Sequence, residues 1–282
     1  MRVRIRIKPN SVAGTLLVER LSHPKLLKAA AQESELALVP LPAEVFVARR
    51  QRVRSKIFIA VALLMISVAF IHQSYTVPMR ARQSQDLGQR LFNVARYTQA
   101  IVAFSAAISY EPNYREAYLF RGRARVGMND IGPAIDDFSR AIELRPADAE
   151  AYIYRGRVHL ELKHFNDALK DGNAAMERNP TSAEAYSLKG ATLRAQGRLA
   201  EAARNFDAAV QLDASIVNLF ERGITYQMLG QHQRAVADLG RIIETNPYSP
   251  ETLYSRARSF SELGDETRAR LDRKIADSVQ GE

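Results

Sequence analysis

The chain has 282 residues, 46% hydrophobic and 25% charged, which is the balance of a folded protein. It contains no cysteine, and this excludes disulfides, thiolate catalysis and cysteine-bound metal centres. Its net charge of +9 arises in residues 1–80, which hold 13 Lys/Arg against 4 Asp/Glu, whereas residues 81–282 hold 27 of each. The larger part of the chain has no net positive field, so we expect no nucleic-acid partner.

Residues 1–56 form a basic N-terminal arm. The segment MRVRIRIK alternates aliphatic and basic side chains, which is typical of a half-buried strand. Pro24 can open a helix through LLKAAAQESELAL. Such a piece is too small to bury much core by itself. Two interpretations stay open: a basic face that contacts anionic lipid or a cytoplasmic partner, and a loosely ordered tail.

Residues 57–78 predict a transmembrane helix. No formally charged residue lies between Ile57 and Met79, and the run IFIAVALLMISVAFI is apolar apart from one serine. Pro78 is expected to end the helix. Because this run of 15 residues is shorter than the ~20 that span a bilayer comfortably, a core helix of a cytosolic scaffold is the alternative.

The charges beside this segment predict its orientation. Five cations lie between Arg49 and Lys56, and Lys/Arg are retained on the cytoplasmic side of a membrane. The segment is therefore predicted to be a signal anchor, with a cytoplasmic N-terminus and an extracytoplasmic C-terminal part. Arginine outnumbers lysine by 32 to 8, a composition that favours a bacterial inner membrane with the larger part in the periplasm.

The region 81–276 repeats with a spacing of 34 residues. We divide it into the units 81–114, 115–148, 149–182, 183–215, 216–249 and a partial 250–276. Small residues recur at positions 8 and 20, where they let two antiparallel helices approach closely. In the second to fourth units these are Gly122, Gly156, Gly190, Ala134, Ala168 and Ala202. A proline at position 32 ends the second helix, and stacked pairs bury a continuous core.

This pattern resembles the tetratricopeptide repeat (TPR) family. The segments AYLFRGRARVGMNDIGPAIDDFSRAIELRP and AEAYIYRGRVHLELKHFNDALKDGNAAMERNP carry the resemblance, which covers five full repeats and a partial sixth. The resemblance implies an all-α fold, a right-handed α-solenoid of TPR helix pairs, preceded here by one transmembrane helix and a small arm.

Position 7 departs from the family pattern. It carries arginine or lysine in place of the usual leucine, and an aspartate or asparagine stands 16 residues later. This co-occurrence predicts an ion pair between the two helices of a repeat. The pairs are Arg121/Asp137, Arg155/Asp171, Lys189/Asn205, Arg222/Asp238 and Arg256/Asp272.

Repeats two and three depart further from the pattern. Arg125 and His159 stand at position 11, where an aromatic core residue is usual, and Gly172 replaces the aromatic at position 24. One interpretation is a polar hollow that binds a ligand. The favoured one is that Arg125 extends to solvent and neighbouring side chains close the gap.

The resemblance also implies a binding groove. In this family the stripe at positions 2, 5, 9 and 12 of the first helix lines a concave groove for a peptide or helix. Here the predicted groove residues are Leu119, Phe120, Arg123, Ile153, Tyr154, Arg157 and Arg194. Aliphatic and aromatic side chains with guanidinium groups suit a partner with acidic groups or a C-terminal carboxylate, unless these arginines are ordinary solvated surface.

One TPR subclass clamps chaperone tails with lysine and asparagine at positions 5 and 9. Here these positions hold Gln85 and Gln89, then Leu119 and Arg123, so no such clamp is expected.

The sequence offers no catalytic constellation. His159 and His164 are five apart, the wrong spacing for two ligands on one helical face, so no metal is expected. Neither a phosphate loop nor a nucleophile elbow is present. We therefore expect a membrane-tethered scaffold that is no enzyme, needs no cofactor and binds a partner protein. The alternative is a regulatory or assembly subunit of a membrane enzyme complex that acts through the basic arm.

Overall fold

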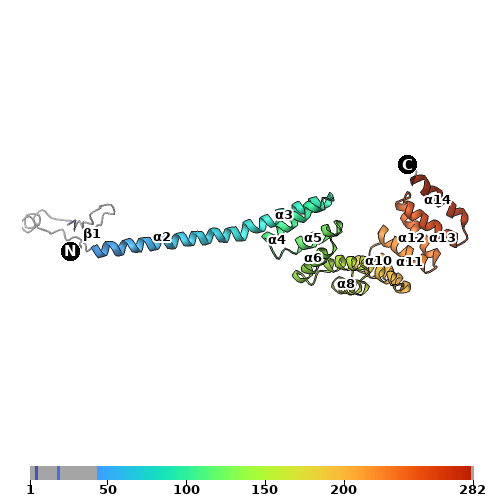
Figure 1. Ribbon diagram of the computed structural model, residues 1–282, viewed down its shortest axis with the longest axis horizontal. Helices are drawn as coiled ribbons and strands as arrows, with labels where there is room; N and C mark the ends of the chain where they lie inside the picture. The colour runs from blue at the N-terminus through green and yellow to red at the C-terminus, as the bar shows by residue number, and fades with distance from the viewer. Residues whose placement is uncertain (1–3, 6–17, 20–42, 281–282) are drawn as a thin grey trace, which may run out of the picture. The chain divides into compact units, whose positions relative to one another are not determined.

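The computed structural model divides the chain into two units, Met1–Ser74 and Tyr75–Glu282 (Figure 1). It describes residues 4–5, 18–19 and 43–280. In the first unit β1 (Arg4–Ile5) pairs antiparallel with β2 (Val18–Glu19). The strand β1 lies within the alternating segment MRVRIRIK, whereas the helix expected after Pro24 lies outside the described residues.

The apolar segment is helical and exposed. It lies in α2 (Ala43–Ile71), where Phe58 is 79% exposed. Among the described residues one helical segment, Arg54–Asn93, is long and apolar enough to cross a membrane, and none of its apolar window is buried. A helix docked in the core of a protein would be mostly buried.

The helix does not end at Pro78, contrary to the prediction. A five-residue π-helical segment, η1 (His72–Thr76), follows α2, and α3 (Val77–Asn93) continues from it. This change of register places Pro78 in the first turn of α3, where the N–H that proline lacks is not needed for an intrahelical hydrogen bond.

The second unit is a curved stack of helices (Figure 1). Each helix packs against the next one along the chain, which confirms the predicted all-α solenoid. After α3 come α4 (Tyr97–Tyr110), α5 (Arg115–Gly127), α6 (Ile131–Leu144), α7 (Ala149–Glu161), α8 (Phe165–Arg178), α9 (Ala183–Ala195), α10 (Leu199–Leu212), α11 (Ile216–Met228), α12 (His232–Thr245), α13 (Pro250–Glu262) and α14 (Glu266–Gln280).

The ends of these helices follow local chemistry. Four first helices begin at a side chain that accepts a hydrogen bond from a backbone N–H of the first turn: Asp148, Ser182, Ser215 and Ser249. The turn inside each repeat contains one residue with positive φ at position 15, which reverses the chain after the first helix. These residues are Ala95, Asn129, Lys163, Gly197, Gly230 and Gly264.

Glycine at position 8 permits the close approach of the two helices. A Cβ added to Gly122 would lie 2.7 Å from the ring of Phe138. In the third repeat, where Gly172 replaces the aromatic, a Cβ on Gly156 would instead lie 2.6 Å from Leu188 Cδ2. Leu188 belongs to the fourth repeat, so a neighbouring side chain closes the gap, as the favoured interpretation predicted.

The predicted ion pairs are confirmed in four repeats. Each arginine Nη2 or Nε lies 2.7–2.8 Å from a nearly buried aspartate: Arg121–Asp137, Arg155–Asp171, Arg222–Asp238 and Arg256–Asp272. The hydrogen bonds that Arg155 donates to Asp171 and Arg222 donates to Asp238 raise the pKa of each guanidinium. These contacts join the first helix of a repeat to its second helix.

Three of these arginines also reach the preceding repeat. Arg121 Nη1 donates to Ser105 Oγ at 3.0 Å, and Arg155 Nη1 donates to Ser139 Oγ at 3.0 Å. Arg222 Nη1 lies 3.1 Å from Asp207 Oδ1. Each of these arginines therefore links its own first helix to two second helices, one from each of two repeats.

Two positions differ from this arrangement. In the fourth repeat the amide of Asn205 donates to the carbonyl of Glu201, and the described residues show no bond between it and Lys189. Arg125, which was expected to extend to solvent, instead places Nη1 2.7 Å from Asp137 Oδ2. Asp137 thus binds two guanidinium groups, which a buried carboxylate with four lone-pair sites accepts readily.

Replacing Asp137 tests how much these contacts stabilise the stack. Asp137→Ala leaves two guanidinium groups without their carboxylate, and we expect a loss of about 3 kcal/mol in the free energy of unfolding. The exposed neighbour Asp136 is the matched control, and Asp136→Ala should change stability by less than about 0.5 kcal/mol. The measurement is denaturant unfolding of the full chain in detergent, followed by circular dichroism; equal losses in both variants would contradict this role.

Candidate functional site

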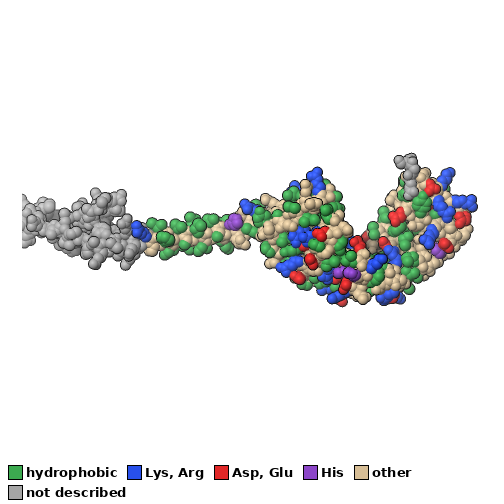
Figure 2. All heavy atoms as spheres, viewed as in Figure 1, with side chains coloured by type: hydrophobic (Ala, Val, Ile, Leu, Met, Phe, Trp, Pro, Cys, Tyr) green, Lys and Arg blue, Asp and Glu red, His purple; other side chains and the backbone are tan. Residues whose placement is uncertain are grey.

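The first helices of the repeats lie on the inner side of the curve. Each of them (α3, α5, α7, α9, α11 and α13) contacts the next first helix, whereas among the described residues no second helix contacts another second helix. In a curved stack, successive helices lie closer to one another on the inner side than on the outer side. Figure 2 shows the repeat region hollowed between its two ends, with side chains of both charges along the hollow. We call this hollow the inner groove.

An arginine–aromatic cluster runs along three successive first helices. It consists of Phe92 on α3, Phe120 and Arg123 on α5, and Tyr154 and Arg157 on α7. Arg123 Cζ lies 5.0, 4.9 and 4.7 Å from the ring centroids of Phe92, Phe120 and Tyr154. Arg157 Cζ lies 5.9 Å from the Tyr154 centroid. Such cation–π contacts contribute from about 0.5 to 2 kcal/mol each, according to their exposure.

The core holds these rings in place. Phe120 stacks on the buried Phe104 at 6.0 Å between centroids, and Tyr154 stacks on the buried Phe138 at 5.9 Å. Position 6 of one repeat therefore packs on position 24 of the repeat before it. Because these rings stack on buried core residues, the cluster is preorganised for binding.

The predicted groove arginines differ in their partners. Arg194 pairs with Glu221 of the next repeat and donates to its carbonyl at 3.2 Å. Arg123 and Arg157 make no ion pair with any described residue, and Arg157 is exposed. These two guanidinium groups can donate hydrogen bonds to a carboxylate of a partner, whereas that of Arg194 is already paired with Glu221.

Two aliphatic residues of the predicted groove are in the core. Leu119 is 0% exposed and packs with Ala134 and Phe138, so its assignment as a groove residue is wrong. The sequence pattern could not show this, because the contact comes from the neighbouring helices of the stack. Ile153 is 7% exposed and packs with Ala175.

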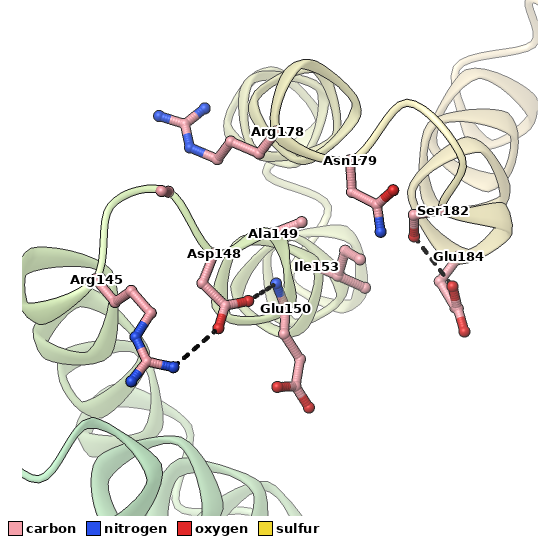
Figure 3. A pocket seen from close by; sticks show the side chains of 10 residues that line it. Arg145, Asp148, Ala149, Glu150, Ile153, Arg178, Asn179, Ser182 and Glu184 are labelled. Atoms are coloured by element: carbon pink, nitrogen blue, oxygen red, sulfur yellow. Dashed lines mark hydrogen bonds and ion pairs between the residues drawn. The ribbon is translucent and has the colours of Figure 1, made fainter.

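Ile153 also borders a hollow of about 550 Å³ at the loops between repeats, which we call the edge hollow (Figure 3). In Figure 3 Arg145 and Asp148 lie on one side of Ile153, and Asn179 and Ser182 lie on the other. Its carboxylates have structural partners: Asp148 accepts from the backbone N–H of residue 150 and lies 2.7 Å from Arg115. This mixture of charges favours no particular ligand.

The third repeat contains a cluster that the spacing argument missed. His159, His164 and Asp167 each offer a ligand atom, and these atoms lie within 4.8 Å of one another. The two histidines are not on one helix: α7 ends at Glu161, and the turn that follows brings His164 back toward His159. Their positions 11 and 16, in a repeat unit made of two helices, were the signal available in the sequence. We call these three residues the turn cluster.

Burial lowers the pKa of His159, against a smaller opposing effect of Asp171 and Asp167. The imidazole of His159 is therefore neutral at pH 7, the form in which histidine accepts a hydrogen bond or binds a metal.

Comparison with known proteins identifies the repeats. Two family models, both described as tetratricopeptide repeat, match this chain at residues 121–183, 160–215 and 218–249. The repeats within residues 121–215 and 218–249 are tetratricopeptide repeats. The TPR assignment made from the 34-residue period is thereby confirmed.

A curated relative shares part of the TPR region. The tetratricopeptide repeat and J domain-containing co-chaperone DNJ1 of Cryptococcus neoformans var. grubii is 31% identical over 83 residues. These residues are 29% of this chain but 16% of the co-chaperone, so the chain spans less than a fifth of the length of this relative.

Solved structures share the TPR fold. A thermophilic TPR protein of Thermus thermophilus is 20% identical with a TM-score of 0.56, over 65% of this chain and 98% of that one. The pilF protein of Pseudomonas aeruginosa is 14% identical with a TM-score of 0.63, over 70% and 90%. MamA of Desulfovibrio magneticus RS-1 is 23% identical with a TM-score of 0.52, over 60% and 96%. At these identities the likeness shows the fold alone.

Proposed function

We propose that this chain is a non-catalytic, membrane-tethered scaffold that binds a partner protein in the inner groove of its TPR region. The observation that carries the proposal is the arginine–aromatic cluster, with Arg123 and Arg157 free of carboxylates beside fixed aromatic rings. Arginine and aromatic side chains in partly desolvated positions contribute most of the binding energy in protein interfaces.

The chemistry of the cluster favours a partner segment with acidic groups. A carboxylate can form a bidentate hydrogen-bonded pair with the exposed guanidinium of Arg157. An apolar side chain next to it can pack on the rings of Phe92 and Phe120, which lie 6.3 Å apart between centroids. The partner is thus an extended peptide or helix that carries a carboxylate beside an apolar anchor.

The proposed tether is the exposed apolar helix. At about 1.5 Å per residue, the 15 residues Ile57–Ile71 span about 22 Å, and His72 and Tyr75 extend the helix with groups suited to the headgroup region. The cations before Ile57 favour a cytoplasmic N-terminus, which places the repeats on the extracytoplasmic side, in a bacterium the periplasm. Tethering raises the local concentration of a weakly held partner.

Site-specific photo-cross-linking tests the groove. A photoreactive amino acid at Glu161, one helical turn after Arg157, should cross-link the partner in intact cells. Arg157→Glu should reduce this adduct by roughly tenfold or more, because it replaces the attracting charge with a repelling one. Arg204→Glu, an exposed cation on the second helix α10, is the matched control and should leave the adduct unchanged.

A photoreactive group at Asn173 on the second helix α8 tests the opposite face. Cross-linking of the same partner from Asn173 but not from Glu161 would place the binding surface outside the inner groove and contradict the proposal.

Membrane extraction tests the tether. The wild-type chain should stay in the membrane pellet after carbonate treatment. Leu64→Arg places a charge in the apolar segment at a cost of about 2.5–3.5 kcal/mol and should move a large share to the supernatant. Val217→Arg, at an exposed aliphatic residue of the repeat region, is the control and should stay in the pellet. Release of the wild-type chain would contradict the tether.

The absence of cysteine makes the orientation simple to measure. With single cysteines introduced at Ser11 or at Asn173, a membrane-impermeant maleimide added outside the cytoplasmic membrane should label Asn173→Cys and spare Ser11→Cys until the membrane is opened. The reverse pattern would overturn the proposed orientation and leave the groove proposal intact.

A further inference from the structure

The turn cluster of the third repeat has the composition of a metal site. It joins the end of α7, which carries His159, to the start of α8, which His164 precedes and whose first turn holds Asp167. The ring centroids of the two histidines are 6.0 Å apart, and the three ligand atoms lie within 4.8 Å of one another. Histidine nitrogen and carboxylate oxygen are ligands that zinc prefers.

The backbone of the turn fixes the relative positions of the two histidines. The N–H of His164 donates to the carbonyl of His159 at 2.8 Å, and that of Lys163 donates to Leu160 at 2.9 Å. Lys163 takes a φ of +59°, the left-handed conformation that reverses the chain. The approach of the two imidazoles is therefore a consequence of the turn itself.

The third repeat differs from the others at these positions. Positions 16 and 19 hold Arg198 and Glu201 in the fourth repeat, where they form an ion pair at 2.7 Å. In the sixth repeat Asp265 and Arg268 stand there and also form an ion pair. Repeat three alone among the six combines metal-ligand side chains at positions 11, 16 and 19.

One buried atom of the cluster lacks a hydrogen-bond partner. His159 Nδ1 is shielded from solvent, and no described donor or acceptor reaches it. A buried polar atom without a partner is costly and calls for an explanation such as a bound ion. We propose that His159, His164 and Asp167 bind a zinc-class divalent cation through three protein ligands and leave one coordination position open.

The ligand distances allow such a site with small movements. Zinc lies about 2.0–2.2 Å from nitrogen and oxygen ligands, so the ligands of a tetrahedral site are about 3.4 Å apart. His164 and Asp167 are exposed and can rotate to close the remaining distance. Figure 2 shows histidine and acidic side chains together at the lower edge of the repeat region, open to solvent.

A cation at this point would bond the ends of two helices whose contact lacks the usual aromatic side chain. Gly172 of α8 lacks the aromatic side chain that fills this position in repeats one, two and four, and Leu188 of the next repeat takes its place. A metal bonded to both ends of the turn would hold α7 and α8 together independently of repeat four.

The test uses the full chain, purified in detergent without a histidine tag and titrated with Zn²⁺ against a chromophoric chelator. We expect one zinc per chain, and His164→Gln or Asp167→Asn should each weaken binding about tenfold or more. Bound zinc should raise the melting temperature of the wild type and not that of His164→Gln. Co²⁺ in place of Zn²⁺ should give the intense visible absorption of a four-coordinate site.

His232→Gln is the matched control. His232 also stands at the start of a second helix, but it is not part of a group of three possible metal ligands among the described residues. This variant should bind zinc like the wild type. Equal zinc affinity of the wild type and His164→Gln, or a Co²⁺ spectrum of the weak aqueous type, would overturn the proposal. Arg157→Glu should leave zinc binding unchanged, so the outcome is independent of the groove experiment.

Discussion

The solenoid depends on an arginine that links its own helix to two others. The side chain at position 7, exemplified by Arg121, binds the aspartate of its own second helix and a polar group on the second helix of the preceding repeat. A carboxylate such as Asp137, only 3% exposed, requires a charged partner with fixed geometry. Apolar packing tolerates sliding, whereas a bidentate pair does not. We infer that these contacts set the register between successive repeats more than they add net stability.

The pairing of these aspartates with position 7 affects which arginines of the inner groove have an acidic partner. The aspartates facing the first helices are bound to position 7, so the arginines at position 9 find no acidic partner within the repeats. Residues 81–282 carry equal numbers of positive and negative groups, yet their arginines form two populations. Arg155 pairs with Asp171, whereas Arg157, two residues later on the same helix, makes no ion pair with a described residue. The helical period separates these roles, because residues two apart point to different sides.

The third repeat is where the pattern of the stack is least regular. It lacks the aromatic filler, borrows Leu188 from its neighbour and places two histidines around its turn. In a repeat protein the regular positions serve the stacking of the repeats. Positions that depart from the pattern are therefore candidates for another role. The proposed cation site and the irregular core thus belong to one helix pair. The groove residue Arg157 and the cation ligand His159 lie two residues apart on α7 and point to different sides of the helix, so a partner and a cation can occupy the same repeat without competition.

The sequence by itself determined the all-α repeat architecture and four of the five cross-helix pairs, because a 34-residue period fixes which side chains recur on the facing sides of two helices. Only the tertiary structure decided that Leu119 is buried, that Pro78 does not end its helix and that His159 meets His164 across a turn. These outcomes depend on contacts between helices and on the exact path of the chain between them. Helical periodicity describes one helix at a time and does not contain that information.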